Sequence, residues 1–244
     1  MATETLQFGS NTATLVRLED EKLDGMIERL GLSRPHPAIE VVGGAGGMSD
    51  ELSQATATIF QEVVVPFVEK NNLAVVDGGT DYGVMQAMGR ARAARGANFP
   101  LIGVVVEAIV HKKAEENGFF PPSVLEPNHS HFVFTPGASW GDEAPFIARL
   151  TTEIAHGEPS LTLLVNGGEI TLQDAAYSIE QGRKVVVFEG SGRTADTIAI
   201  STTGKGLDRR ALKLVTSGLV GVVNPYKNPE KLRMELEQHF RLAS

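Results

Sequence analysis

The sequence contains no cysteine. This absence excludes a disulfide framework, a thiolate nucleophile and a sulfur-ligated metal site, and it is consistent with a reducing cytoplasm. Long apolar runs are missing as well, because no stretch approaches the roughly 18 to 20 residues that a membrane span needs. Residues 1–20 also lack the basic segment and apolar segment of a signal peptide. We therefore expect a cytoplasmic protein that neither crosses nor binds a membrane.

Basic residues are few: 22 Lys and Arg stand against 30 Asp and Glu, which gives a formal net charge of -8. They form no run that would follow a nucleic-acid backbone, so we expect no nucleic acid as a partner. The acidic balance does not exclude a small anionic ligand. Oriented backbone amides and one or two arginines act locally, whereas distant surface charge is screened over about 8 to 10 Å.

With 244 residues, 42% of them hydrophobic, the chain is long enough to bury one sizeable core. From residue 38 onward, short runs of Val, Ile and Leu alternate with segments of helical periodicity. The expected strands are 38–42, 73–77, 101–106, 131–134, 161–165, 184–188 and 219–223. The expected helices are 50–70, 83–95, 142–155, 172–181, 193–200 and 229–240. Strands of unbroken apolar residues are buried on both faces, so the pattern predicts an α/β fold: one doubly wound, Rossmann-like domain with a mostly parallel sheet and helices on both faces.

The other segments are expected to be peripheral to this sheet. Residues 1–35, with a short strand at 12–16 and a helix at 21–30, predict a lead-in that packs on the main domain of residues 36–244. Residues 108–130 predict an irregular insert, and a polar stretch at 201–208 precedes the last strand.

Five of the expected strands end in turns of glycine and other small residues. These turns are Gly43–Gly44, Gly78–Gly79, Pro136–Gly137, Gly167–Gly168 and Gly190–Gly192. Because the carboxyl ends of parallel strands meet at one edge of a sheet, the turns would place free backbone N–H groups and helix N-termini along that edge. Such an edge favours phosphate, so the pattern predicts a nucleotide-binding fold.

The first turn, Gly43-Gly44-Ala45-Gly46-Gly47, lacks the spacing of the dinucleotide fingerprint and the Gly-Lys-Ser/Thr ending of a P-loop. Glycines permit close approach of a phosphate or ribose to the backbone. They are equally expected in a tight connection between a strand and a helix, and both interpretations stay open.

Two turns carry a family resemblance. Gly78-Gly79-Thr80-Asp81-Tyr82-Gly83-Val84-Met85-Gln86-Ala87 and Asn166-Gly167-Gly168-Glu169-Ile170-Thr171-Leu172-Gln173-Asp174 resemble the paired signatures of the lonely-guy (LOG) family. Two further segments, at 125–143 and 189–196, are similar to the cytosolic N-terminal region of melastatin-type TRP channels. That region is classed with LOG-like proteins in the SLOG superfamily. The resemblance covers roughly residues 36–200 and implies a SLOG domain of prokaryotic type that binds an NAD-derived nucleotide.

Arg193 is the strongest single candidate for ligand binding. It follows Gly190-Ser191-Gly192 at an expected helix N-terminus, where its guanidinium could pair with a phosphate. The resemblance implies the same role, since the channels use the matching arginine on ADP-ribose. An arginine that caps a neighbouring loop or pairs with Asp196 is the alternative.

Three aromatic or imidazole side chains are less decisive. His129 and His131 alternate into a strand, but no third ligand stands at a supporting spacing, so we expect no metal. We expect one of them to pack and hydrogen-bond and the other to line the cleft. Trp140, the only tryptophan, could stack on an adenine or cover the core.

The departures from the family patterns bear on mechanism. The glutamate that serves catalysis in the LOG phosphoribohydrolases is matched by Asp174, and Ile147 stands where the ADP-ribose-binding channels have an arginine. A carboxylate that is one methylene shorter on an altered loop argues against the same hydrolysis.

We therefore expect a protein that binds or senses ADP-ribose, cyclic ADP-ribose or a related nucleotide at the carboxyl edge of the sheet, with no resident cofactor. The alternative is a LOG-like nucleotide N-glycosidase or phosphoribohydrolase that uses Glu169 or Asp174. The resemblance also implies a homodimer. The expected ligand-binding residues are Gly43, Gly44, Ala45, Gly46, Gly47, Gly78, Gly79, Thr80, Gly83, Val84, Met85, His129, His131, Trp140, Asn166, Gly167, Gly168, Glu169, Gly190, Ser191, Gly192 and Arg193.

Overall fold

The computed structural model describes residues 3–18, 23, 25–44, 46–110 and 124–240. Nine strands in this part of the chain form one sheet. In chain order they are β1 (Glu4–Phe8), β2 (Asn11–Arg17), β3 (Ala38–Gly43), β4 (Ala74–Asp77), β5 (Leu101–Val106), β6 (His131–Thr135), β7 (Ser160–Val165), β8 (Lys184–Phe188) and β9 (Val220–Val223). The strand order across the sheet is β1-β2-β6-β5-β4-β3-β7-β8-β9, and every neighbouring pair except β1 and β2 is parallel. The predicted doubly wound α/β fold is confirmed.

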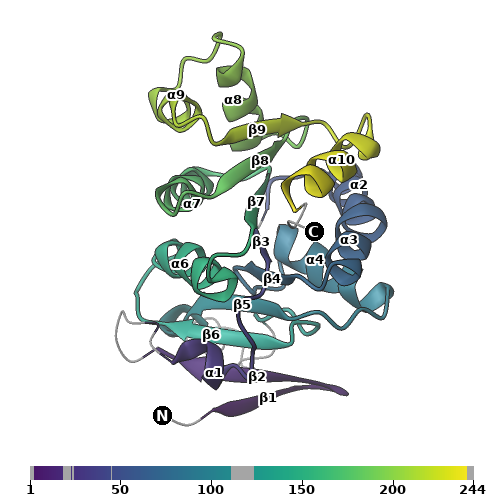
Figure 1. Ribbon diagram of the computed structural model, residues 1–244, viewed down its shortest axis with the longest axis vertical. Coiled ribbons are helices and arrows are strands. Elements are labelled where there is room, and N and C mark those ends of the chain that lie inside the picture. Colours follow the sequence, from purple (N-terminus) through teal and green to yellow (C-terminus); the bar gives the residue numbers. More distant parts are fainter. Residues whose placement is uncertain (1–2, 19–22, 24, 45, 111–123, 241–244) are drawn as a thin grey trace.

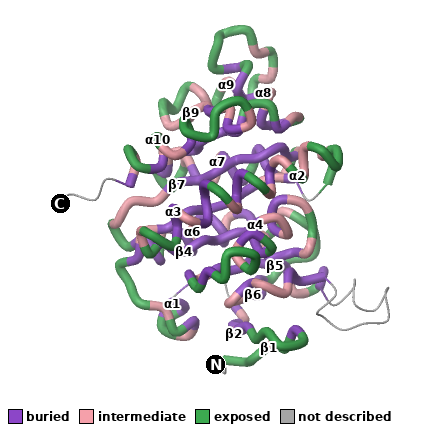
Figure 2. Tube along the Cα trace, turned by 90° about the vertical axis from the view of Figure 1, so that its right-hand side faces the viewer, coloured by how far each residue is buried: buried purple, intermediate pink, exposed green. Residues whose placement is uncertain are grey.

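Helices cover both faces of the sheet (Figure 1). On one face lie α1 (Met26–Arg29), α6 (Ala144–Ala155), α7 (Glu169–Glu180), α8 (Arg193–Thr202) and α9 (Arg209–Thr216). On the other lie α2 (Asp50–Ile59), the π-helical turn η1 (Phe60–Val64), α3 (Val65–Lys70), α4 (Gly83–Ala94) and α10 (Pro229–His239). The strands between these layers are buried, whereas much of the β1–β2 hairpin is exposed (Figure 2). This arrangement explains why the apolar runs of the central strands are unbroken.

The segment predicted as one helix, 50–70, is helical throughout but widens at η1. Pro66 is the second residue of α3 and has no N–H to donate. Its ring would clash with the carbonyl group four residues earlier in a regular α-helix. A π-helical turn is one way in which a helix accommodates such a residue, and here Val65 N–H bonds to the carbonyl of Phe60.

Strand β1 and helix α9 were not predicted. Strand β1 was missed because its apolar residues, Leu6 and Phe8, alternate with exposed polar residues. The strand pairs only with β2, at the edge of the sheet. Helix α9 was missed because it has only eight residues, although Asp208 caps its N-terminus by accepting from the N–H groups of Arg210 and Ala211. The expected insert at 108–130 lies largely outside the described residues, and the expected helix at 21–30 is described from Gly25 onward.

The order of the strands fixes where a ligand can enter. From β3 the chain passes over one face to β4, whereas β7, which flanks β3 on its other side, is reached through α6 on the opposite face. The loops that follow β3 and its neighbours therefore part at the carboxyl end of β3. Open α/β sheets bind their ligands at such a switch point.

Candidate functional site

A cavity of about 720 Å³ lies at this switch point. Its volume is in the range of small-molecule sites, which is roughly 300 to 1,000 Å³. Its walls come from the carboxyl end of β3, the β4–α4 turn, α6, the N-terminal turns of α7 and α8, and the loop before α6. The lining residues are Val41, Val42, Gly43, Gly44, Gly78, Thr80, Tyr82, Met85, Val124, Trp140, Glu143, Ile147, Gly168, Glu169, Ile170, Thr171, Asp174 and Arg193.

The turn after β3 lies against the turn after β7 with no room for a side chain. A Cβ atom on Gly44 would stand 2.7 Å from Oδ1 of Asn166 and 3.0 Å from the carbonyl oxygen of Gly46. The backbone of this turn therefore forms the cavity wall directly, and glycine is required here for close approach.

Asn166 fastens the turn after β7 to the turn after β8. Its N–H donates to Ser191 Oγ at 2.7 Å, and its Nδ2 donates to the carbonyl of Ser191 at 2.6 Å. Asn166 holds a left-handed backbone conformation with φ 55°, which non-glycine residues seldom adopt. Its Oδ1 is buried and has no hydrogen-bond partner among the described residues.

Arg193 lines the cavity and is exposed to solvent. It is the first residue of α8 and is also left-handed, with φ 52°. Its Nη1 donates to the carbonyl of Gly46 at 3.0 Å, so its guanidinium crosses from α8 to the turn after β3. Asp196 accepts from Gly190 N–H instead, and in the described part of the chain no carboxylate pairs with Arg193. Of the two expected alternatives, the Arg193–Asp196 pair is not formed, whereas the bond to Gly46 is a contact of the arginine with a neighbouring loop.

The helix N-termini at the cavity differ in whether their backbone N–H groups already have a hydrogen-bond partner. At α8, the N–H groups of Thr194 and Ala195 point to the carbonyls of Gly167 and Asn166, at 3.5 and 3.0 Å, so the β7–α7 turn takes up these donors. At α7, the first-turn residues Glu169, Ile170 and Thr171 line the cavity itself. The N–H of the N-cap Gly168 donates to Thr171 Oγ1 at 3.3 Å, and the N–H groups that follow it are the ones without a partner within the helix. The α7 N-terminus is therefore the better place for an anion.

Three carboxyl groups line the cavity, and their surroundings shift their pKa values in different directions. Burial, followed by the nearby charges of Glu40 and Glu143, raises the pKa of Asp174 well above its usual range. Burial likewise raises the pKa of Glu143, whose Oε2 accepts from Gly141 N–H at 2.9 Å. Glu169 is exposed, and the pKa of this carboxyl is lowered by hydrogen bonds from Arg210 and by its charge.

A buried ionic network lies close enough to Asp174 for the charge of Glu40 to raise the pKa of that carboxyl. Glu40 on β3 pairs with Arg183 and accepts from Ser178 Oγ at 3.1 Å, while Arg183 Nη2 donates to the carbonyl of Ala148 at 2.7 Å. Glu40 and Arg183 are almost completely buried. The network ties β3 to α6 and α7, which carry Glu143 and Asp174.

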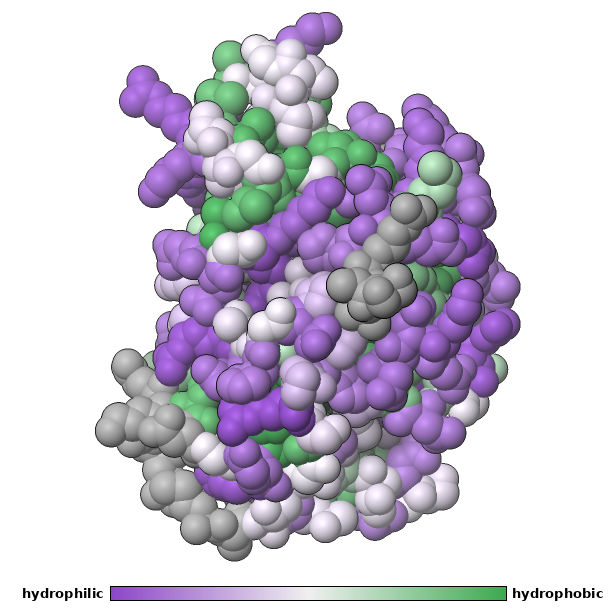
Figure 3. Space-filling view, viewed as in Figure 1, coloured by the Kyte–Doolittle hydropathy of each residue, from purple (hydrophilic) through white to green (hydrophobic). Residues whose placement is uncertain are grey.

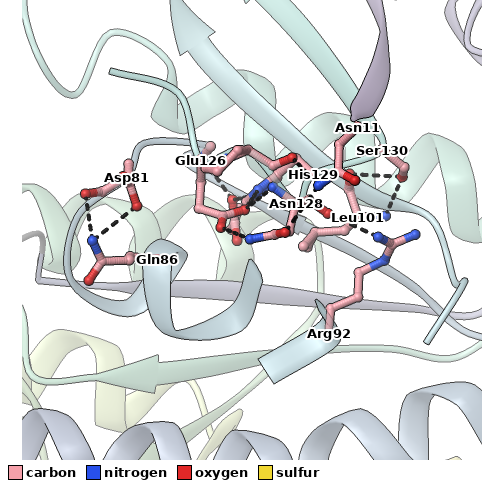
Figure 4. Close-up of polar contacts among 12 residues, drawn as sticks. Asn11, Asp81, Gln86, Arg92, Leu101, Glu126, Asn128, His129 and Ser130 are labelled. Carbon is pink, nitrogen blue, oxygen red and sulfur yellow. Dashed lines mark hydrogen bonds and ion pairs between the residues drawn. The ribbon is translucent and has the colours of Figure 1, made fainter. Parts of the chain in front are cut away.

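A second buried network fixes the turn after β4. His129 lies between two carboxylates, with Nε2 2.9 Å from Asp77 Oδ1 and Nδ1 2.8 Å from Glu126 Oε2. Asp77 Oδ1 also accepts from Gly79 N–H at 2.7 Å. Figure 4 shows Glu126 and His129 turned toward each other next to α4. Burial lowers the pKa of His129, but the two carboxylates outweigh it and raise the pKa to about 9. His129 is therefore an imidazolium at neutral pH.

The sequence is also similar to those of known proteins. A family model described as SLOG in TRPM, prokaryote, matches residues 36–233, most of the chain. The chain belongs to this SLOG family.

Several relatives of the SLOG domain are channel proteins. Transient receptor potential cation channel subfamily M member 2 of Mus musculus is 27% identical over 209 residues, which cover 71% of this chain and 14% of the channel. The subfamily M member-like 2 protein of Nematostella vectensis is 25% identical over 230 residues, or 78% of this chain and 15% of that protein. The chain thus spans about a seventh of the length of these relatives.

The fold of the SLOG domain is also found in a solved structure. The molybdenum cofactor carrier protein of Chlamydomonas reinhardtii matches with a TM-score of 0.53 and 14% identity, covering 83% of this chain and 99% of that one. This neighbour shows that the architecture is shared. No described helix of the SLOG domain is long and apolar enough to cross a membrane.

The SLOG domain brings together about half of the residues expected from sequence. The expected residues that line the cavity are Gly43, Gly44, Gly78, Thr80, Met85, Trp140, Gly168, Glu169, Asp174 and Arg193. Those that lie outside its lining are Gly46, Gly47, Gly79, Gly83, Val84, His129, His131, Asn166, Gly167, Gly190, Ser191 and Gly192. Ala45 lies outside the described residues.

The two histidines, His129 and His131, show the clearest difference between expected and observed positions. His129 is the packed member of the pair, as expected, but His131 does not line the cavity. It is the first residue of β6, at the end of the strand away from the carboxyl edge, where Ser130 Oγ lies 2.8 Å from its Nδ1. Burial lowers the pKa of His131 to about 4. Its position at the amino end of a parallel strand separates it from the cavity.

Sequence reasoning missed several lining residues. Tyr82, Ile170 and Thr171 belong to turns that were considered mainly for their glycines, and Val124 lies in the segment that was expected to be an irregular insert. Glu143 and Ile147 are four residues apart on one helix, and this spacing places them on the same face. Ile147 was named from the sequence only as the position where the ADP-ribose-binding channels have an arginine, and its spacing from Glu143 is the signal that would have identified the two residues together.

Proposed function

We propose that this SLOG domain binds a nucleotide that carries a pyrophosphate, of the ADP-ribose type, in the cavity at the carboxyl end of β3. The observation that carries the proposal is the position of Arg193. Arg193 lines the cavity, its guanidinium donates to the turn after β3, and it has no carboxylate partner in the described part of the chain. An arginine held in this way matches the geometry of a phosphate.

Phosphate would lie between Arg193 and the first turn of α7, where the backbone of Gly168 and Glu169 lines the cavity. A Cβ on Gly168 would stand 3.0 Å from Arg193 Nη2, so the guanidinium and this helix N-terminus are already adjacent. The helix dipole, the amides that follow Gly168 and the guanidinium would then act on the same phosphate group, while the Gly168 N–H donates to Thr171 Oγ1.

The base and sugar would occupy the other walls. Met85, Ile147 and Ile170 provide apolar surface, and Tyr82 and Trp140, exposed by 53% and 42%, stand at the opening. Aromatic rings at such a position stack on a purine. Burial raises the pKa of Asp174 and of Glu143 and so favours their neutral forms, which can donate hydrogen bonds to ribose hydroxyls.

Isothermal titration calorimetry with ADP-ribose, cyclic ADP-ribose, NAD and AMP tests this function. We expect saturable binding that Arg193→Ala weakens by roughly ten- to a hundredfold, the size of a lost charge-assisted hydrogen-bond pair. Arg95→Ala is the matched control, since Arg95 is exposed at the C-terminal end of α4. Trp140 fluorescence gives an independent signal at the cavity opening. Absence of heat and of a fluorescence change with all four nucleotides would rule out the proposal.

A second candidate function is hydrolysis of the N-glycosidic bond of a nucleotide. The raised pKa of Asp174, a cavity-lining carboxyl, favours it, because a protonated acid could donate its proton to a departing base while water adds to the ribose carbon. Chromatography of nucleotides incubated with the protein separates the two candidates. Release of free base, lost in Asp174→Asn, supports hydrolysis, whereas binding without release supports a sensor.

A further inference from the structure

A residue outside the cavity lining forms an ion pair with a carboxylate in the lining. Arg210, in the first turn of α9, pairs with both carboxylate oxygens of Glu169, the first residue of α7. Its Nη2 also lies 3.1 Å from Oδ2 of Asp208, the N-cap of α9, so the guanidinium is held from two sides. The pair joins α9 to the helix N-terminus at the cavity.

The charge on Glu169 matters because of its position. Of the three carboxyls in the lining, burial favours the neutral form of Asp174 and of Glu143, whereas Arg210 favours the ionised form of Glu169. An ionised side chain in the first turn of a helix is itself attracted to the free amides there. Glu169 would therefore compete with an anionic ligand for the α7 N-terminus if nothing restrained it.

We propose that Arg210 is a positioning residue for ligand binding, which holds the Glu169 carboxylate toward α9 and offsets its charge, so that the α7 amides and Arg193 remain available to a phosphate group. This inference rests on the function proposed above. Arg210 is not among the described residues that line the cavity, so it acts through Glu169 rather than on the ligand.

The chain offers a matched control on the same helix turn. Arg209 precedes Arg210, is exposed, and forms no ion pair among the described residues. Removing either arginine changes the net charge by the same amount, so any effect of overall charge appears in both variants. Both side chains of the pair are largely exposed, 58% for Arg210 and 74% for Glu169, so their substitution leaves the core intact.

The test is a set of calorimetric titrations with ADP-ribose and with inorganic pyrophosphate. We expect Arg210→Ala to weaken binding by about three- to fivefold, the size of a well-formed surface ion pair. Arg209→Ala should bind like the wild type. Arg210→Ala combined with Glu169→Gln should recover the wild-type affinity to within about twofold, because the unrestrained charge is then absent.

The outcomes separate the inference from the function on which it rests. If Arg210→Ala binds as tightly as the wild type, or if the double variant stays as weak as Arg210→Ala, Arg210 does not act through Glu169 and the inference fails while the function stands. If the wild type binds neither probe, the inference about Arg210 and the proposed function are both refuted. Carboxyl-carbon NMR titration adds a readout without ligand: the pKa of Glu169 should rise in Arg210→Ala and stay unchanged in Arg209→Ala, and an unchanged pKa in both contradicts the pairing.

Discussion

Replacing His129 by glutamine should make the stability of the protein respond differently to pH. The imidazolium lies between Asp77 and Glu126 with no exposed side-chain surface, and a pKa of about 9 exceeds the ordinary histidine value of 6.5. At about 1.4 kcal/mol for each tenfold change in proton affinity, this difference corresponds to about 3 kcal/mol of stabilisation. Because the folded-state pKa is the higher one, the stabilisation is complete below pH 6.5 and disappears as the pH rises through about 9.

Urea unfolding of the wild type and of His129→Gln at half-unit steps from pH 6 to pH 9.5 measures this contribution. The free-energy difference between the two proteins should be largest at pH 6 and should shrink by about 3 kcal/mol by pH 9.5. His131→Gln is the matched control. The pKa of His131 is lowered to about 4, so this side chain is neutral in both states above pH 7.5 and its difference should be flat there.

A difference between wild type and His129→Gln that does not vary with pH would refute the reasoning, since His129 would then be neutral in the folded protein. Should the variant not fold, the wild type alone decides the question. The imidazole C–H resonance of His129 should titrate near pH 9 in NMR spectra, and a midpoint near 6.5 contradicts the arrangement.

Three further outcomes are expected. Gly44→Ala should weaken the binding of ADP-ribose in calorimetry, because its Cβ would lie 2.7 Å from a side-chain oxygen, whereas Gly46→Ala, with nothing within 4 Å, should not; equal affinities contradict this. Asp174→Asn should raise the free energy of unfolding at pH 7, since burial disfavours the carboxylate, and the gain should vanish as the pH falls toward 3.8; a gain that does not depend on pH argues against it. Arg183→Met should cost about 3 to 5 kcal/mol in urea unfolding by leaving Glu40 buried without its partner, and adding Glu40→Gln should recover part of the loss; unchanged stability of the single variant would be the opposing result.

Much of the fold could be predicted because apolar runs and glycine turns are local signals. The strand that contains Val41 and the turn that contains Gly44 were both located from a few neighbouring residues. The missed helix α9 shows the limit of this approach, since its eight residues are stabilised by a cap and by packing against α8.

The site was predicted in outline, and its chemistry was not. Glycines identified the edge of the sheet, but Glu40 lies inside a strand that otherwise reads as apolar, and its partner Arg183 is 143 residues away in sequence. The same holds for Arg210 and Glu169, which are 41 residues apart. Pairings of this kind depend on how helices pack on the sheet, and no local pattern encodes them.

Exposed apolar residues were also not identified from the sequence. Ile200 and Leu207 are exposed by 53% and 94%, and Figure 3 shows apolar side chains reaching the surface in its upper part, where α8, α9 and β9 lie. Helical periodicity in the sequence does not distinguish these residues from core residues of the same type.

The bond between Arg193 and the carbonyl of Gly46 has a consequence for the thermodynamics of recognition. An arginine that swings freely in solvent loses rotational freedom when it captures an anion, and that loss opposes association. Here the folded chain has already restricted the side chain, so an arriving phosphate exchanges one acceptor for a better one. The loss of side-chain entropy on binding should therefore be small, and the protein should need little conformational adjustment. The remaining barriers to association are then the encounter of the two molecules and the desolvation of the phosphate and the guanidinium.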